Sequence, residues 1–228
     1  MYRRLVLLDL RGTGRSAYPD SAASYSCDRQ VADVEALRDH LGLARVDVPA
    51  HSAGANLAMH YAARRPGRVG RLALVGPVSG RWAWRSTGGC AARSRCGGRA
   101  SRGSRPPSPH GRRSPLEAIA EGTGSDREAV AHFGADGAFE PEVTRAALAR
   151  FESPVLLLAG ESELNSPPRA VAQCAELFPG AALVEQPGAG HCPWIDDPDR
   201  FVATASAFLG QAQFLSLKIL HARPLCSV

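Results

Sequence analysis

A serine, two carboxylates and a histidine each follow a short apolar segment of the chain, and these residue types can perform nucleophilic catalysis. Ser52 follows residues 44–50, Glu161 and Glu163 follow residues 153–160, and His191 follows residues 181–187. A serine hydroxyl is a weak nucleophile at neutral pH, so it needs a base, and imidazole has a suitable pKa. A carboxylate then holds the imidazole in the correct tautomer and stabilises the imidazolium that forms.

The segments that must position these residues alternate between two patterns. Short apolar runs, typical of buried strands, occupy residues 5–10, 44–50, 71–77, 153–161 and 181–188. Amphipathic or Ala-rich runs, typical of helices, occupy residues 28–43, 52–65, 140–151, 167–178 and 197–210. This alternation predicts an α/β fold with a doubly wound, mostly parallel sheet. Because sites in such sheets form beyond the carboxyl ends of the strands, the serine, a carboxylate and the histidine should meet there.

Local signals predict how two of these segments are held. We expect Asp28 to cap the start of the first helix and Gly42 to end it, since these residue types favour those positions. The Gly-punctuated segment RGTGRS after the first strand is predicted to be a loop. We expect an ion pair between Asp9 and Arg11 to hold this loop.

The bulk composition is that of a globular protein. The 228 residues are 44% hydrophobic and 21% charged. No apolar run approaches the roughly 20 residues of a membrane-spanning helix, and the run Leu5–Leu8 is too short for the core of a signal peptide. We therefore expect a cytoplasmic protein with no membrane partner. The six cysteines form no CxxC pair and fit no zinc spacing, so we expect scattered reduced thiols and no metal site.

The net charge of +5 is concentrated in one segment. Residues 81–113 are rich in Arg, Gly, Ser and Pro, and no acidic residue lies between Asp47 and Glu117. A nucleic-acid-binding function is the remote alternative for such a segment, because Arg contacts phosphates and aromatic rings stack on bases. Trp82 and Trp84 lie together at one end rather than among the arginines, which argues against nucleic acid as a partner.

Four motifs together resemble the α/β-hydrolase superfamily. They are LDLRGTGRS (8–16), AHSAGAN (50–56), LAGESELNSPP (158–168) and GAGHCPWIDDPDRF (188–201). The closest resemblance is to esterases and proline iminopeptidase-like enzymes with an inserted cap. It implies a hydrolase core in two parts, residues 1–80 and 153–210. A cap insertion with a disordered start would then occupy residues 81–152, and residues 211–228 would form a tail.

The resemblance also implies roles for individual residues. Ser52 would be the nucleophile, His191 the base and Glu163 the acid, with Glu161 as the alternative acid. The backbone N–H of Ala53 would contribute to the oxyanion hole. The substrate would be a small-molecule ester or amide, and no metal or organic cofactor is needed for this chemistry. His51, beside the nucleophile, is interpreted as a packing or loop-lining residue.

The sequence departs from the family pattern in three ways that concern the site. Ala50 replaces the first Gly of the nucleophile turn, and Glu163 stands where Asp is usual. Three strands normally precede the motif at 8–16, and the loop after the third supplies a second oxyanion N–H. That third strand normally lies between the strands 5–10 and 46–50, so we expect a gap there or an unusual pairing. A catalytically inactive hydrolase fragment is therefore the competing prediction. The sequence does not predict the oligomeric state.

Overall fold

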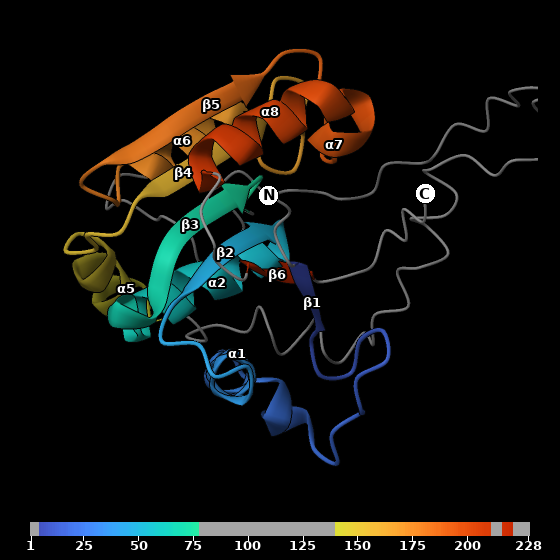
Figure 1. The fold of residues 1–228 in the computed structure, drawn as a ribbon, viewed down its shortest axis with the longest axis vertical. Coiled ribbons are helices and arrows are strands. Elements are labelled where there is room, and N and C mark those ends of the chain that lie inside the picture. The colour runs from blue at the N-terminus through green and yellow to red at the C-terminus, as the bar shows by residue number, and fades with distance from the viewer. Residues whose placement is uncertain (1–4, 78–139, 211–215, 221–228) are drawn as a thin grey trace, which may run out of the picture.

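The computed structural model describes residues 5–77 and 140–210, and the backbone of residues 216–220 (Figure 1). The strands are β1 (Leu5–Asp9), β2 (Val46–His51), β3 (Val69–Val75), β4 (Val155–Gly160), β5 (Ala181–Gln186) and β6 (Ser216–Leu220). The α-helices are α1 (Cys27–His40), α2 (Ala53–Arg64), α5 (Pro141–Leu148), α6 (Pro168–Ala175), α7 (Pro193–Asp196) and α8 (Pro198–Leu209). Short 3₁₀ turns occupy Ala22–Tyr25 and Pro66–Arg68.

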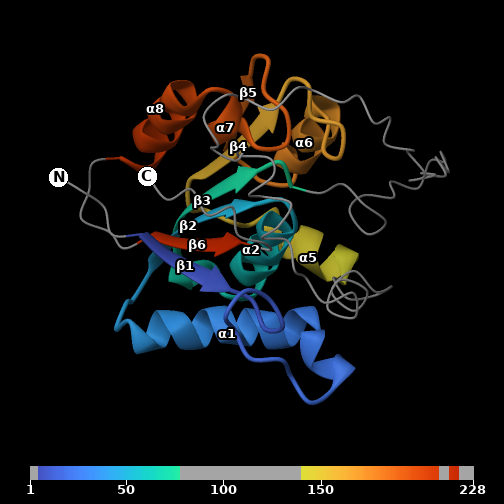
Figure 2. The same cartoon turned by 90° about the vertical axis from the view of Figure 1, so that its right-hand side faces the viewer.

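The strands form one sheet in the order β1-β6-β2-β3-β4-β5, and every described neighbouring pair is parallel. Helix α8 lies on one face of this sheet, and α2 and α6 lie on the other (Figures 1 and 2). The predicted α/β class with a doubly wound parallel sheet is therefore confirmed. All the strands present their carboxyl ends at the same edge, which is where the site residues follow β2, β4 and β5.

The core lies around the central strands and the Ala-rich helix behind them. Every residue of β4 is buried, as are the α2 residues Gly54 to Ala62. Strands covered on both faces need continuous apolar sequence, and the small side chains of α2 allow this helix to lie close to the sheet. Among the described residues, no helix is both long enough and apolar enough to cross a membrane.

The expected gap beside β2 is not present, because β6 lies there. Its residues pair in parallel with β1 from Leu5↔Ser216 to Asp9↔Leu220, and with β2 at Asp47↔Ser216 and Ala50↔Ile219. Unpaired N–H and C=O groups on two facing strand edges are unfavourable, and a segment from elsewhere in the chain can satisfy them. The expectation was a gap or a direct pairing of two strands that are normally apart, and the structure shows neither, because β1 and β2 each pair with residues 216–220 of the expected tail.

Most of the predicted cap lies outside the described residues. This includes the Arg-rich stretch 81–113, so its predicted disorder and the alternative of nucleic-acid binding stay predictions. The end of the predicted cap is described, and there α5 packs against α2 with Leu148 fully buried. Helix α5 therefore packs on the core, and the predicted division of the chain at residues 81–152 and 153–210 stays a prediction.

One predicted end of α1 is right and the other is wrong. Gly42, with a φ of 66°, follows the last residues of the helix as expected. At the start, the N-cap residue is Ser26, and Asp28 lies inside the first turn, where its carboxylate forms an ion pair with Arg64 of α2. A carboxylate in the first helical turn is favourable because of the helix dipole, and here it also joins two helices.

The loop after β1 is also held differently from the prediction. Arg11 forms a bidentate pair with Asp33 of α1, with N–O distances of 2.8 and 2.5 Å. Asp9 instead accepts a hydrogen bond from the backbone N–H of Arg15 through its side chain, and one from the Ser16 hydroxyl through its carbonyl. Arg11 therefore links this loop to the neighbouring helix, and Asp9 shapes the loop itself.

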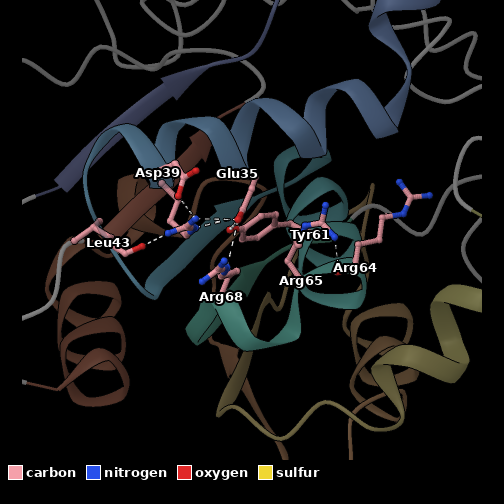
Figure 3. A network of polar contacts seen from close by, with 8 residues as sticks. Glu35, Asp39, Leu43, Tyr61, Arg64, Arg65 and Arg68 are labelled. Carbon is pink, nitrogen blue, oxygen red and sulfur yellow. Dashed lines mark hydrogen bonds and ion pairs between the residues drawn. The ribbon is translucent and has the colours of Figure 1, made fainter.

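A polar network joins α1 to α2 away from any predicted catalytic residue (Figure 3). Glu35 accepts hydrogen bonds from Arg38 and from the buried Tyr61 hydroxyl, and it forms an ion pair with Arg68. The hydrogen bonds from Arg38 hold the pKa of Glu35 below its ordinary value, and burial raises the pKa of Tyr61. Arg38 also donates to the carbonyl of Leu43 just after the helix. The network therefore fixes α1 on α2, the helix that follows Ser52.

Candidate active site

Ser52 occupies a strained turn between β2 and α2. Its φ of 55° and ψ of −125° lie in a region that non-glycine residues rarely adopt, at a typical cost of about 1–3 kcal/mol. The turn is held by a hydrogen bond from the Ser52 N–H to the carbonyl of Val75, with an N–O distance of 2.9 Å. Ala50 and Gly54 on either side are buried, and the small Ala50 methyl group and the absence of a side chain at Gly54 leave room for the turn. The methyl group of Ala50 is accommodated where Gly was expected.

The start of α2 offers backbone donors beside the Ser52 hydroxyl. Ser52 is the N-cap residue of this helix, and within the described residues the N–H of Ala53 has no hydrogen-bond partner. Free N–H groups at a helix start, together with the helix dipole, favour a negative charge nearby. The position of Ala53 therefore suits the predicted oxyanion role.

Glu163 and His191 meet at the carboxyl ends of β4 and β5. His191 Nδ1 lies 2.5 Å from Glu163 Oε2. The other carboxylate oxygen accepts hydrogen bonds from the backbone N–H groups of Asn165 and Ser166, at 2.6 and 3.3 Å. The Glu163 side chain is only 2% exposed, against 34% for His191. A buried carboxylate fixed in this way can hold the imidazole ring in one orientation.

Glu161, the alternative acid, contacts the histidine loop at another point. Its Oε2 accepts a hydrogen bond from the backbone N–H of Gly188, with an N–O distance of 2.7 Å. Glu163 therefore contacts the imidazole ring of His191, and Glu161 contacts the backbone of the loop that carries His191. This geometry favours Glu163 over Glu161 as the partner of His191.

The histidine loop, residues 187–197, is held by several further contacts. Ser162 donates its N–H to the carbonyl of Ala189 at 2.8 Å, and Gly190 donates its N–H to Asp196 Oδ2 at 2.8 Å. The buried Gln186 side chain donates to the carbonyl of Pro193 at 2.8 Å. Several hydrogen bonds from different parts of the structure restrict the conformation of a loop. The position of His191 is therefore determined by the loop backbone as well as by Glu163.

His51 connects the Ser52 turn to the histidine loop. Its Nε2 donates to the carbonyl of His191 at 2.8 Å, and the two imidazole rings lie 4.5 Å apart between centroids. Trp194 packs edge-on against His51 at 4.7 Å. The residue before Ser52 is thus in direct contact with His191, although no hydrogen bond between the described residues joins the Ser52 hydroxyl to the imidazole.

Two residues that position the histidine loop were not identified from the sequence. A Cβ atom on Gly160 would lie 2.5 Å from the carbonyl oxygen of Ala189 and closer still to that of Gly190. Gln186 is the polar residue that holds the far side of the loop. The available signals were a Gly and a Gln at the last positions of β4 and β5, where the sheet approaches the loop.

Among the described cysteines, Cys192 belongs to the histidine loop, where its backbone carbonyl accepts a hydrogen bond from the N–H of Ile195. Cys27 and Cys174 are buried, and burial raises the pKa of each thiol to about 12. Cys192, next to His191, is partly exposed. Within residues 5–77 and 140–210, no group of three His, Cys, Asp or Glu side chains comes together in a way that could hold a metal ion.

Comparison with known proteins finds similarity to hydrolases. A model of the alpha/beta hydrolase family matches residues 1–204. A probable proline iminopeptidase from Streptomyces coelicolor is 43% identical over 82 residues, which cover 34% of this chain and 25% of the relative. Lipase LipV from Mycobacterium tuberculosis is 44% identical over 70 residues, covering 31% of this chain and 26% of the lipase. The matched part of this chain thus spans about a quarter of each of these relatives.

Solved structures show the same fold over a longer range. A thermophilic esterase from Thermogutta terrifontis superposes with a TM-score of 0.60 at 21% sequence identity. The match covers 88% of this chain and 77% of the esterase. At this level of identity the similarity concerns the fold alone.

Proposed function

Because the chain belongs to the alpha/beta hydrolase family, we propose that it is a serine hydrolase that cleaves an ester or amide bond through an acyl-enzyme on Ser52. The observation that carries the proposal is the contact between Glu163 and His191 beside the strained turn of Ser52. A turn with positive φ at a serine is costly, and such strain persists at sites where it serves a function.

In the first half of the proposed reaction, the Ser52 hydroxyl attacks the carbonyl carbon of the substrate. His191 Nε2 takes the hydroxyl proton, and Glu163 stabilises the imidazolium through Nδ1. The N–H of Ala53 donates to the oxyanion that develops on the carbonyl oxygen. His191 then gives its proton to the leaving alcohol or amine, which leaves the acyl group on Ser52.

In the second half, His191 removes a proton from a water molecule, and the resulting hydroxide attacks the acyl carbon. The proton then returns from His191 to Ser52 as the acid product leaves. Each step uses only groups of this chain and water, so the mechanism requires no metal or organic cofactor.

The proposed substrate class is a small-molecule ester or amide. It follows from the acyl-transfer chemistry of this site, and the names of two relatives point the same way: one is called a lipase and the other a probable proline iminopeptidase. Ester and amide hydrolysis share the tetrahedral intermediate that the site is proposed to stabilise.

The test is covalent labelling by a fluorophosphonate probe, which reacts with an activated serine. We expect the 228-residue chain to be labelled and the Ser52→Ala variant to show no labelling. Ser162→Ala is the matched control, because Ser162 is exposed and lies next to Glu163 in the acid loop. The control should be labelled at the rate of the unmodified chain.

Two results would contradict the proposal. Labelling that persists in Ser52→Ala would place the reactive serine elsewhere. The absence of labelling in a folded, unmodified chain would support the competing prediction of an inactive hydrolase fragment.

A further inference from the structure

Strand β6 is the last strand along the chain, but it lies between β1 and β2 in the sheet. We propose that the space between β1 and β2 is a strand-binding site, that residues 216–220 of the same chain occupy it, and that this occupancy is what attaches β1 to the sheet. Among the described strands, β1 pairs only with β6. The inference goes beyond the proposed function, since it concerns how the sheet is assembled and not its chemistry.

The pairing of β1 with β6 continues along the whole of both strands, from Leu5↔Ser216 to Asp9↔Leu220. The side chains of Leu5 and Leu7 are 53% and 54% exposed. The side chains of Val6 and Leu8, on the other face, pack against the core, so β1 is held both by these apolar contacts and by its backbone pairing with β6. Without β6, β1 would lose the strand that connects it to the rest of the sheet.

The other edge of β6 supports the strand that leads to the nucleophile. Ile219 pairs with Ala50, two residues before Ser52, and Ser216 pairs with Asp47. Helix α2 also packs against β6. Because β6 is parallel to β1 and β2, its carboxyl end lies at the same sheet edge as the nucleophile turn. Occupancy of the strand site therefore supports both β2 and the loop that follows β1.

The first test uses pairs of introduced cysteines in the full chain to identify which segment lies beside β1 and in which register. Val6 and Leu217 are register partners, and adjacent strands lie about 4.8 Å apart, within the Cα separation that a disulfide spans. The matched control pairs Val6 with Lys218, one residue out of register, since successive residues of a strand alternate between the faces of a sheet. After mild oxidation, we expect the Val6→Cys/Leu217→Cys chain to form an intramolecular disulfide at least tenfold faster than Val6→Cys/Lys218→Cys.

Peptide mapping by mass spectrometry distinguishes the outcomes. A disulfide that joins positions 6 and 217 within one monomer supports the proposal. The same bond between two chains would show that a second copy donates the strand, which overturns the assignment to the same chain. Equal rates for the matched and mismatched pairs would overturn the register.

The second test measures what β6 does for β1. Leu217→Pro removes a backbone N–H from the middle of a strand with two neighbours, which proline does not tolerate. Val228→Pro places the same residue type at the chain terminus as the control. We expect Leu217→Pro to lower hydrogen-exchange protection of residues 5–9 at least tenfold, while β3 and β4 remain protected.

Retained protection of residues 5–9 in Leu217→Pro would overturn the proposal. If Leu217→Pro does not fold, the cysteine-pair test still shows whether residues 216–220 of the same chain lie beside β1, because the cysteine variants carry no proline in β6. Neither test depends on catalysis, so a failure here is distinct from a failure of the serine hydrolase proposal.

Discussion

Replacement of Gly160 by Ala tests whether the histidine loop is held in place by contact with the end of β4. The new Cβ would lie 2.5 Å from the carbonyl oxygen of Ala189, whereas ordinary van der Waals contact begins at 3.4 Å. The loop must therefore move by about 1 Å, and His191 follows directly after the displaced Gly190. A misplacement of this size costs about 10²-fold in rate, or roughly 2.7 kcal/mol of transition-state stabilisation.

The assay is the second-order rate of fluorophosphonate labelling, measured beside the free energy of unfolding in urea. We expect Gly160→Ala to label about 10²-fold more slowly and to lose roughly 1–3 kcal/mol of stability, because the strand end is overpacked. Gly180→Ala is the matched control, since its Cβ would meet nothing within 4 Å. The control should keep the rate and the stability of the unmodified chain.

A Gly160→Ala variant that labels within about threefold of the unmodified rate would refute the reasoning. It would show that the loop can shift without displacing the imidazole, or that His191 does not act on Ser52. Measuring both variants at a urea concentration where each is fully folded separates slow labelling from partial unfolding.

Three further predictions concern other charged or reactive groups. Glu163→Gln should slow labelling by about 10³- to 10⁴-fold because a carboxamide does not stabilise the imidazolium. The control Glu161→Gln keeps a side-chain oxygen that can accept the hydrogen bond from the Gly188 N–H, and equal losses in the two variants would contradict the assignment. Burial lowers the pKa of His60 to about 4, so the unfolded chain binds this proton more readily. The stability present above pH 6.5 is then lost as the pH falls towards 4, by about 2–3 kcal/mol at pH 4.5. In urea titrations at pH 7 and 4.5, the free energy of unfolding of His60→Gln should fall between these pH values by about 2–3 kcal/mol less than that of the unmodified chain. Burial raises the pKa values of the Cys27 and Cys174 thiols to about 12, so both should resist alkylation by iodoacetamide in the folded chain. Alkylation of either cysteine as fast in the folded chain as in urea, measured by mass spectrometry, would contradict this.

The parts of the fold that depend on local sequence agree with the predicted elements. The predicted strand at 153–161 is β4, and the predicted helix at 28–43 is α1, with Gly42 at its end. Local side-chain partners were less predictable, since Asp28 pairs with Arg64 and Arg11 pairs with Asp33. Each of these partners comes from a helix whose position depends on packing, so the sequence near Asp28 or Arg11 does not specify it.

The sequence by itself determined the alternation of strands and helices, and it placed Ser52, a carboxylate pair and His191 after strands whose carboxyl ends share one edge. Only the tertiary structure decided that Glu163 contacts the imidazole while Glu161 holds Gly188, because the two carboxylates lie two residues apart on one loop. It also decided that residues 216–220 pair between β1 and β2. Strand pairing joins backbone groups that are far apart in the chain, so it depends on which edges remain open once the other elements have packed.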